Sequence, residues 1–420
     1  MWNSIAAVAQ SAPDRTALVD GARRVTYGAL WCEVRRLAAA LRASGLTHGD
    51  RVAIVLPSCI EAVVARYGTW LAGGVAVPLN VQAGVHELGR CLSECEASFV
   101  VHSDDHRALE QAVDALPAPP DRIEWSHGEG TPWEVESTFP PPRTPRTPAR
   151  LALLLYTMGT TRRPKGVMLS FANLLADAHA TKAHLGLRGT DCVVTTLPLH
   201  RSCGASLVHA HLAAGACVIL TPSFASAHSL SQTVIRECAT GLEVAPSTFA
   251  LLLDHASRVA HDLSSLRYVS VAGGVIESPH LRRVSAALPS VRLSTTYGQT
   301  EATAHLTATP PERLDAKVGS VGVPISGVRL EIRRKGGERA LPGEVGDVWV
   351  TGDNVMIGYL NDPAATRAAI RDGWLDTGDR GYVDEDGFLF LSGRRSAPPA
   401  ARPRVLEKIL RLGPQLGGVV

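Results

Sequence analysis

This sequence has little lysine, few aromatic side chains and almost no net charge. Its 42 basic residues include only five lysines, at positions 165, 182, 317, 335 and 408, which leaves 37 arginines. A formal net charge of +2 produces no field that would recruit nucleic acid or an anionic membrane surface. No apolar run reaches the length that spans a bilayer, and the N-terminal stretch carries Asp14 and Arg15 where a signal peptide would be apolar. We therefore expect a protein with no membrane span and no nucleic-acid partner.

Cysteine is present, but not in a pattern that would define a disulfide framework or a zinc site. The eight cysteines are scattered, and only Cys91 and Cys95 are close, at a spacing that suits one helix face and not a zinc pair. Reduced thiols in a cytoplasmic protein are the expected state. The remaining composition, 45% apolar and 20% charged, is that of an ordinary globular protein, and 420 residues permit two or three domains.

Helix-like and strand-like apolar patterns alternate along the chain. In the first 110 residues, helices are expected at 34–41 and 59–71 and strands at 51–56 and 73–79. The alternation resumes later, with strands expected at 151–155, 192–197, 217–220 and 266–271 and helices at 171–184, 206–214 and 244–252. This alternation predicts an α/β fold with doubly wound, largely parallel sheets.

Two stretches break the alternation. Residues 117–148 are rich in Pro, Ser, Thr and charge, which is typical of an irregular connection. Residues 319–391 contain many glycines and short β-rich runs, and they predict a smaller antiparallel or barrel-like portion.

The expected buried strand at 151–155 leads into a basic loop, residues 156–166, that reads Tyr-Thr-Met-Gly-Thr-Thr-Arg-Arg-Pro-Lys-Gly. Such a loop can wrap a polyphosphate, because glycine lets the backbone approach closely and hydroxyl and N–H groups donate to phosphate oxygens. Lys165 adds a point charge in a chain where lysine is rare. The loop is not a Walker loop, because Gly166 follows Lys165 where Ser or Thr would be required. A basic surface loop is the alternative interpretation.

Further motifs follow this loop in order. Residues 297–301 read Tyr-Gly-Gln-Thr-Glu, residues 374–379 read Trp-Leu-Asp-Thr-Gly-Asp, and between and after them come Gly358-Tyr359 and Gly393-Arg394. The ordered series resembles the adenylate-forming (AMP-binding) superfamily, of the acyl-CoA synthetase or stand-alone adenylation domain type. The resemblance extends over nearly the whole chain, to about residue 395. It implies a large N-terminal domain with two doubly wound α/β subdomains and a smaller β-barrel-like portion.

The resemblance implies that the chain is a ligase that activates a small carboxylic acid with ATP. The carboxylate would attack the α-phosphorus, giving an acyl-adenylate and pyrophosphate. A thiol, of CoA or of an acyl or peptidyl carrier protein, would then take the acyl group. Both steps bring anions together, so the site must supply positive charge, hydrogen-bond donors and Mg²⁺.

The resemblance also assigns roles to the matching positions. Lys165, Thr300 and Glu301 would be catalytic, and Glu301 would bind Mg²⁺, a hard ion that prefers oxygen ligands. The β- and γ-phosphates would lie against the loop residues Thr157, Gly159, Thr160, Thr161 and Lys165.

The nucleoside would be held by later motifs. Tyr297 would stack on adenine, with Gln299 in the same segment and Gly298 keeping the opposite wall open. Asp379 would accept hydrogen bonds from both ribose hydroxyls, and Arg394 would lie near the same sugar.

The acyl pocket is implied less specifically. Residues 198–204, Pro-Leu-His-Arg-Ser-Cys-Gly, resemble a family segment in which His200 stands where an aromatic is common and Arg201 where His is common, while Gly204 matches. Gly273 and Gly274 would border the adenine and acyl pockets. One hypothesis is that Arg201 meets an acidic or polar substrate, and a surface charge at a strand end is the alternative. The low aromatic content, 5%, favours an aliphatic or small aryl acid.

The sequence departs from the family in two places. Met158 and Arg162 replace a small hydroxyl residue and a glycine in the phosphate loop. The chain also stops 27 residues after Gly393, where the family continues into a mobile C-terminal lid. We therefore predict an AMP-binding N-terminal domain over 1–393 and a hinge with a truncated lid remnant over 394–420. An acid–thiol ligase with impaired or lid-dependent activity, a non-catalytic nucleotide- or acyl-binding relative and a truncated gene product all remain open.

Overall fold

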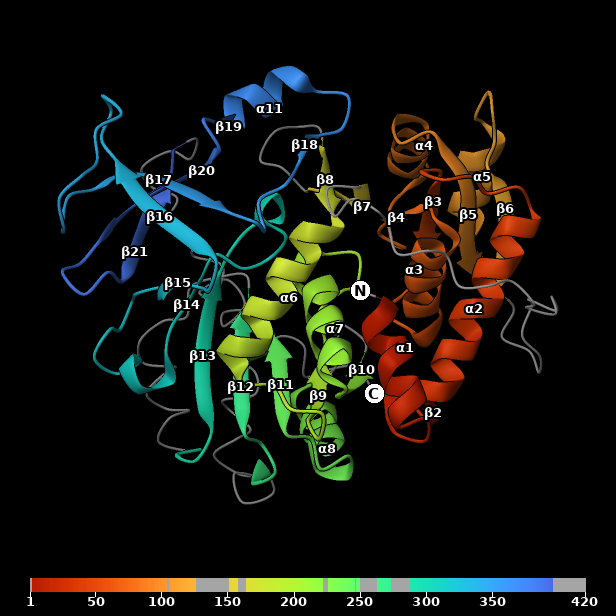
Figure 1. Ribbon diagram of the computed structural model, residues 1–420, viewed down its shortest axis with the longest axis horizontal. Coiled ribbons are helices and arrows are strands. Elements are labelled where there is room, and N and C mark those ends of the chain that lie inside the picture. Colours follow the sequence, from red (N-terminus) through yellow and green to blue (C-terminus); the bar gives the residue numbers. More distant parts are fainter. Residues whose placement is uncertain are drawn as a thin grey trace, which may run out of the picture.

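Two large sheets and one small sheet organise the chain (Figure 1). The structure, a computed structural model, describes residues 2–103, 106–125, 151–157, 164–221, 226–245, 247–249, 263–272 and 288–395. Within those ranges no helix is long and apolar enough to cross a membrane. All eight cysteines fall inside them and are free thiols.

The first large sheet has seven strands in the order β18-β8-β7-β4-β3-β5-β6. The pairings from β7 to β6 are parallel, and β8 and β18 extend one edge in antiparallel fashion. The strands are β3 Arg51–Val55, β4 Val75–Pro78, β5 Ala97–Ser103, β6 Asp121–Trp125, β7 Leu151–Tyr156, β8 Gly166–Ser170 and β18 Gly358–Tyr359. The predicted irregular connection over 117–148 is confirmed at 117–120 but wrong at 121–125, which pair with β5 as an edge strand. Residues 126–148 lie outside the described residues.

The second large sheet has nine strands in the order β15-β14-β13-β12-β11-β9-β10-β1-β2. Its strands from β13 to β1 are parallel to their neighbours, and β2, β14 and β15 are antiparallel additions at the two edges. The strands are β1 Thr16–Asp20, β2 Arg23–Thr26, β9 Cys192–Thr195, β10 Cys217–Leu220, β11 Gly241–Val244, β12 Tyr268–Ala272, β13 Arg292–Tyr297, β14 Thr307–Ala308 and β15 Val323–Pro324.

Helices cover both faces of each large sheet, as the predicted doubly wound fold requires. One hydrophobic core joins the two sheets through the helices between them, which are α1 Trp2–Ser11, α2 Tyr27–Ala43, α3 Ile60–Ala72, α6 Phe171–Leu185 and α7 Ser202–Ala214. In Figure 1, α6 and α7 lie across strands β9 to β13. The outer faces are covered by α4 Val85–Glu94 and α5 Arg107–Asp114 on the first sheet and by α8 Ala227–Arg236 on the second.

The predicted helix over 244–252 is confirmed only in part, because Val244 still belongs to β11 and helical backbone is described at 247–249. Pro246 and residues 250–252 lie outside the described residues. The α6 prediction is confirmed to within one residue, and its start has a physical cause. Ser170 accepts from the Asn173 backbone N–H, while the Asn173 side chain accepts from the Ser170 N–H, which closes a capping box.

The glycine-rich stretch after residue 319 forms mainly a five-stranded antiparallel sheet, as predicted. It consists of β16 Val328–Arg333, β17 Gly346–Gly352, β19 Ile370–Arg371, β20 Trp374–Val383 and β21 Leu389–Arg394. Two short strands of the stretch, β15 and β18, instead extend the two large sheets. The short helix α11 Pro363–Ala369 and the 3₁₀ turns η2 Thr300–Ala302 and η3 Pro311–Arg313 complete the described elements.

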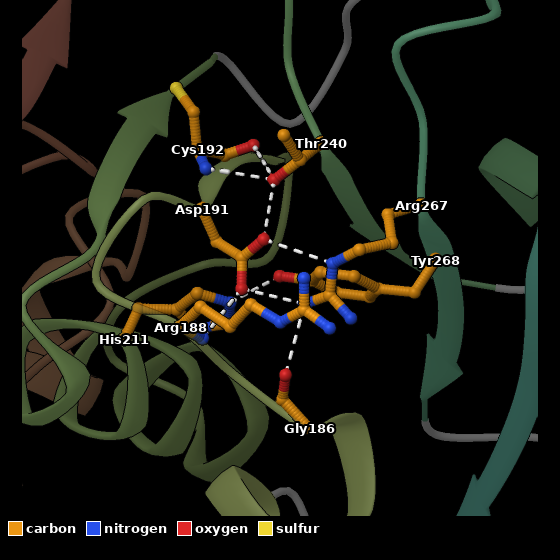
Figure 2. A network of polar contacts seen from close by, with 8 residues as sticks. All are labelled: Gly186, Arg188, Asp191, Cys192, His211, Thr240, Arg267 and Tyr268. Atoms are coloured by element: carbon orange, nitrogen blue, oxygen red, sulfur yellow. Dashed lines mark hydrogen bonds and ion pairs between the residues drawn. The ribbon is translucent and has the colours of Figure 1, made fainter.

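An ion-pair network closes the amino ends of β9, β11 and β12 (Figure 2). The Asp191 carboxylate accepts from Arg267 Nη2 at 2.6 Å and Nε at 3.1 Å, and also from Thr240 Oγ1 at 2.9 Å. Burial alone would raise the pKa of Asp191, but these donors outweigh it and lower the pKa. The network fastens three strands at one edge of the sheet and leaves the opposite edge, where the strands end, for a site.

Candidate functional site

A cleft of about 800 Å³ opens at the carboxyl ends of β11, β12 and β13. Open α/β sheets bind ligands at this edge, and the volume lies in the range of known small-molecule sites. Motif residues from widely separated parts of the chain line it, namely Thr157, Lys165, residues 298–301, residues 376–378 and Arg394. The fold therefore brings together, in one cleft, motif segments that are far apart in the sequence.

The loop over 156–166, predicted above to bind phosphate, connects β7 with β8 at the cleft. Its base is closed by the Thr157 N–H, which donates to the Lys165 carbonyl at 3.0 Å, and by the Lys165 N–H, which donates to Thr157 Oγ1 at 3.3 Å. Both residues line the cleft. The loop tip, with Gly159, Thr160 and Thr161, lies outside the described residues, as do Met158 and Arg162.

Lys165, Tyr359 and Glu301 form a contact chain inside the cleft. Lys165 Nζ lies 4.6 Å from the centre of the Tyr359 ring, and the Tyr359 hydroxyl donates to Glu301 Oε1 at 2.9 Å. Burial, together with the Glu301 charge, raises the pKa of Tyr359, so its hydroxyl remains a donor. The motif Gly358-Tyr359 was part of the ordered series found in the sequence, but no role was predicted for Tyr359. Its place in that series could have marked it as a candidate site residue.

The Glu301 carboxylate suits a magnesium ion that also binds phosphate. No group of three or more His, Cys, Asp or Glu side chains among the described residues could hold a metal by itself. Mg²⁺ in nucleotide sites needs no such group, because one or two carboxylates and phosphate oxygens are its usual ligands. Glu301 lines the cleft beside Lys165 and Thr300, and the Thr300 hydroxyl donates to Ser202 Oγ at 3.4 Å.

Asp379 is held between two donors at the edge of the cleft. The Tyr297 hydroxyl donates to Asp379 Oδ2 at 2.7 Å, and Arg394 Nε donates to Asp379 Oδ1 at 2.9 Å. The pairing of β20 with β21 places Asp379 opposite Arg394. Burial alone would lower the pKa of Arg394, but the charge and hydrogen bond of Asp379 raise it. Tyr297 and Asp379 themselves lie directly beside the cleft residues Gly298 and Gly378.

Gly298 and Gly204 both stand where a backbone approaches too closely for any side chain. A Cβ on Gly298 would lie 1.7 Å from the Ala304 carbonyl oxygen, so its main role is packing within the 297–305 turn, although it also lines the cleft. A Cβ on Gly204 would lie 2.3 Å from the Pro198 carbonyl oxygen, and this glycine does not line the cleft. Gly273 and Gly274 lie outside the described residues.

Of the predicted pocket residues His200 and Arg201, only Arg201 lines the main cleft. Arg201 is the residue directly before α7, and it also lines a second, small cavity that His200 lines too. Burial, with the charges of Arg201 and Arg66, lowers the pKa of His200 to about 4, so this imidazole is neutral. Arg201 is therefore the member of this pair that can meet a ligand in the cleft.

Known proteins are similar to this chain in sequence and in fold. The family model described as AMP-binding enzyme matches residues 5–360. A 2-succinylbenzoate–CoA ligase of Bacillus licheniformis is 32% identical over 392 residues, which are 92% of this chain and 78% of that protein. A feruloyl-CoA synthase of an Amycolatopsis species is also 32% identical, over 92% of this chain and 77% of that protein.

Solved structures agree. The O-succinylbenzoate coenzyme A synthetase of Bacillus subtilis in complex with AMP superposes with a TM-score of 0.83 at 28% identity, covering 94% of this chain and 79% of that one. The same enzyme with an acyl-adenylate intermediate superposes with a TM-score of 0.85, again at 28% identity, covering 94% of this chain and 78% of that one. Sequence, fold and the assembled cleft therefore lead to one conclusion: the chain belongs to the AMP-binding enzyme family, of the acyl-CoA synthetase type.

Proposed function

We propose that this chain uses ATP and Mg²⁺ to convert a carboxylic acid to an acyl-adenylate and then transfers the acyl group to a thiol. The observation that carries the proposal is the convergence of Lys165, Thr300, Glu301 and the Asp379–Arg394 pair on one cleft. Family membership supports it, as do relatives whose names are those of CoA ligases and synthases.

The phosphate end of the cleft carries the first step. A carboxylate oxygen of the acid forms a bond to the α-phosphorus, and the bond to the bridging oxygen of the β-phosphate breaks, so pyrophosphate leaves. Lys165 and Arg201 offset the repulsion between these anions, and Thr157 and Thr300 offer hydroxyl donors. When bound at Glu301, Mg²⁺ would neutralise phosphate charge.

The other end of the cleft positions the nucleoside. Asp379 keeps free lone pairs on both oxygens while Tyr297 and Arg394 hold it in place, so ribose hydroxyls can donate to a carboxylate that is already oriented. A residue held in place before the ligand arrives costs less ordering on binding.

The domain boundary after residue 393 and the lid remnant over 394–420 stay predictions, and residues 396–420 lie outside the described residues.

The second step needs a thiol acceptor, and we propose CoA. The two relatives described above bear the names of a CoA ligase and a CoA synthase, which favours CoA over the pantetheine of a carrier protein. The thiol sulfur would attack the acyl carbon, forming a thioester as AMP leaves.

Acid-dependent exchange of labelled pyrophosphate into ATP tests the proposal. We expect the purified chain to catalyse exchange with at least one acid of a panel, to need Mg²⁺ and to lose exchange in Lys165→Met. Addition of CoA should then yield an acyl-CoA. ATP binding without exchange for any acid would contradict the proposal and indicate a nucleotide-binding relative without turnover.

A further inference from the structure

A small chamber lies below the cleft, lined mostly by polar residues although apolar atoms make up most of its surface. It is lined by Thr181, His184, Leu185, Glu243, Ser270, Thr296, His305 and Ile325. The cleft residues nearest to it are Ala245, Ala272 and Gly298, each two positions after Glu243, Ser270 and Thr296; Ala272 ends β12, while Ala245 and Gly298 directly follow β11 and β13. Because residues two apart in extended backbone share a face, the chamber lies on the same face of the sheet as these cleft residues. The two cavities share no lining residue among the described residues.

The step from these cleft residues to the chamber is short. Two strand residues span about 7 Å. The cleft residues at the ends of β11, β12 and β13 are two alanines and a glycine, so the side chains at these three positions are small. At the cleft, α7 contributes Ser202, and one turn further along α7 Ser206 donates to the Asp177 carboxylate beside the chamber.

The chamber contains charged groups that are largely satisfied by each other. His305 Nδ1 lies 3.4 Å from Asp177 Oδ1 and 3.2 Å from Thr181 Oγ1. Burial alone would lower the pKa of His305, but the hydrogen bond and charge of Asp177 outweigh it and raise that pKa, so the ring and the carboxylate are partners for each other. Burial, with the charges of His305 and Arg292, lowers the pKa of His184 to about 4, which leaves that ring neutral.

Glu243 is the exception. Its side chain lines the chamber, the residue is 1% exposed, and Oε1 has no hydrogen-bond partner among the described residues. Burial raises its pKa to about 7, although the His305 charge works in the opposite direction. A buried carboxyl oxygen without a partner is unfavourable in a folded chain, and such a group calls for an explanation.

The open space beside Glu243 is about 10 Å³, close to the smallest space that holds one water molecule. One hydroxyl or ammonium head group has the same size. An apolar methyl group would fit by volume, but it would leave the Glu243 oxygen unpartnered.

We propose that this chamber is the far end of the acyl pocket, and that the acid which the chain activates carries a small hydrogen-bond donor, a hydroxyl or an ammonium group, that binds Glu243. The inference rests on the proposed function, since it names the substrate class of the same site. It also departs from an expectation drawn from composition, because a polar-ended acid differs from a simple aliphatic or aryl one.

Equilibrium binding by calorimetry to the full chain tests the inference. The probes are straight-chain acids of four to eight carbons that end in methyl, hydroxyl or ammonium. We expect the polar-ended acid of the best length to bind at least tenfold more tightly than its methyl-ended match. Glu243→Leu should abolish this preference, Glu243→Gln should keep it for hydroxyl and lose it for ammonium, and Glu338→Leu, at an exposed position, should change nothing.

A second readout follows from protonation. If the head group is ammonium, binding at pH 7 should release up to about half a proton from Glu243, measured in buffers of different ionisation enthalpy, and Glu243→Gln should release none. Equal or tighter binding of methyl-ended acids, a preference that survives in a folded Glu243→Leu variant, or no binding of any polar-ended acid would overturn the inference. Pyrophosphate exchange with methyl-ended acids alone would uphold the proposed function while overturning the chamber's role.

Discussion

The clearest prediction concerns Asp379, whose carboxylate accepts from Tyr297 and Arg394 at the end of the cleft where we propose that the nucleoside binds. In Asp379→Ala these donors lose their acceptor, and a ribose hydroxyl loses a charged partner. Hydrogen bonds to charged groups contribute about 1.5–3 kcal/mol each. One such bond to ribose therefore corresponds to ATP binding weakened by about 10- to 150-fold, since 1.4 kcal/mol is tenfold. Asp379→Asn, which keeps one acceptor oxygen, should fall between wild type and alanine.

The assay is a double-mutant cycle with calorimetric titration of ATP and 2′-deoxy-ATP against wild type and Asp379→Ala. Wild type should lose affinity when the 2′-hydroxyl is removed, and the variant should lose much less, because its acceptor is already gone. Asp114→Asn is the control, since Asp114 pairs with Arg122 at an exposed position and neither residue lines the cleft. Unchanged ATP affinity in a folded Asp379→Ala variant, or an equal loss on deoxygenation in both proteins, would refute the assigned role.

Three further predictions follow from other contacts. Tyr359→Phe keeps the ring against Lys165 but removes the hydrogen bond to Glu301. The Mg²⁺ concentration that gives half-maximal pyrophosphate exchange should therefore rise about tenfold. An unchanged Mg²⁺ concentration at half-maximal exchange would contradict this. Gly298→Ala places a Cβ 1.7 Å from the Ala304 carbonyl oxygen, and denaturant titration should show a loss of about 1–3 kcal/mol, whereas wild-type stability would show that the turn can yield. Glu243→Gln should become more stable relative to wild type as pH rises from 4.5 to 7. The pKa of Glu243 is higher in the folded chain than in the unfolded chain, so wild type loses on the order of 3 kcal/mol of unfolding free energy over that window. A difference in unfolding free energy between the two proteins that does not vary with pH would contradict this.

The alternating fold could be predicted because its signals are local. Buried strands β3, β4, β7 and β10 are apolar runs bounded by turn residues, and α6 shows helical spacing after a capping serine. β6 escaped prediction because it follows a proline-rich segment and is defined by its pairing with β5, a partner some twenty residues earlier. Long-range pairing of this kind leaves little trace in a short window of sequence.

Some residues of the site could also be predicted from the sequence, and others could not. Lys165, Glu301 and Arg394 could be selected from motif order, and the fold brings them to one cleft. Glu243 could not, because its meaning depends on the register of β11 with β12, which puts it opposite Ser270 and below the cleft. In sequence it is one acidic residue within an apolar stretch, and its lack of a partner becomes visible only when the surrounding elements are packed.

The structure of the chain with a non-hydrolysable ATP analogue and Mg²⁺ tests the central claim most directly. We predict the triphosphate beside Lys165, the metal on Glu301 and the ribose hydroxyls on Asp379, all within the one cleft. A nucleotide bound elsewhere on the chain, or a cleft that remains without nucleotide at saturating concentrations, would contradict the claim that these separated segments form a single ATP site.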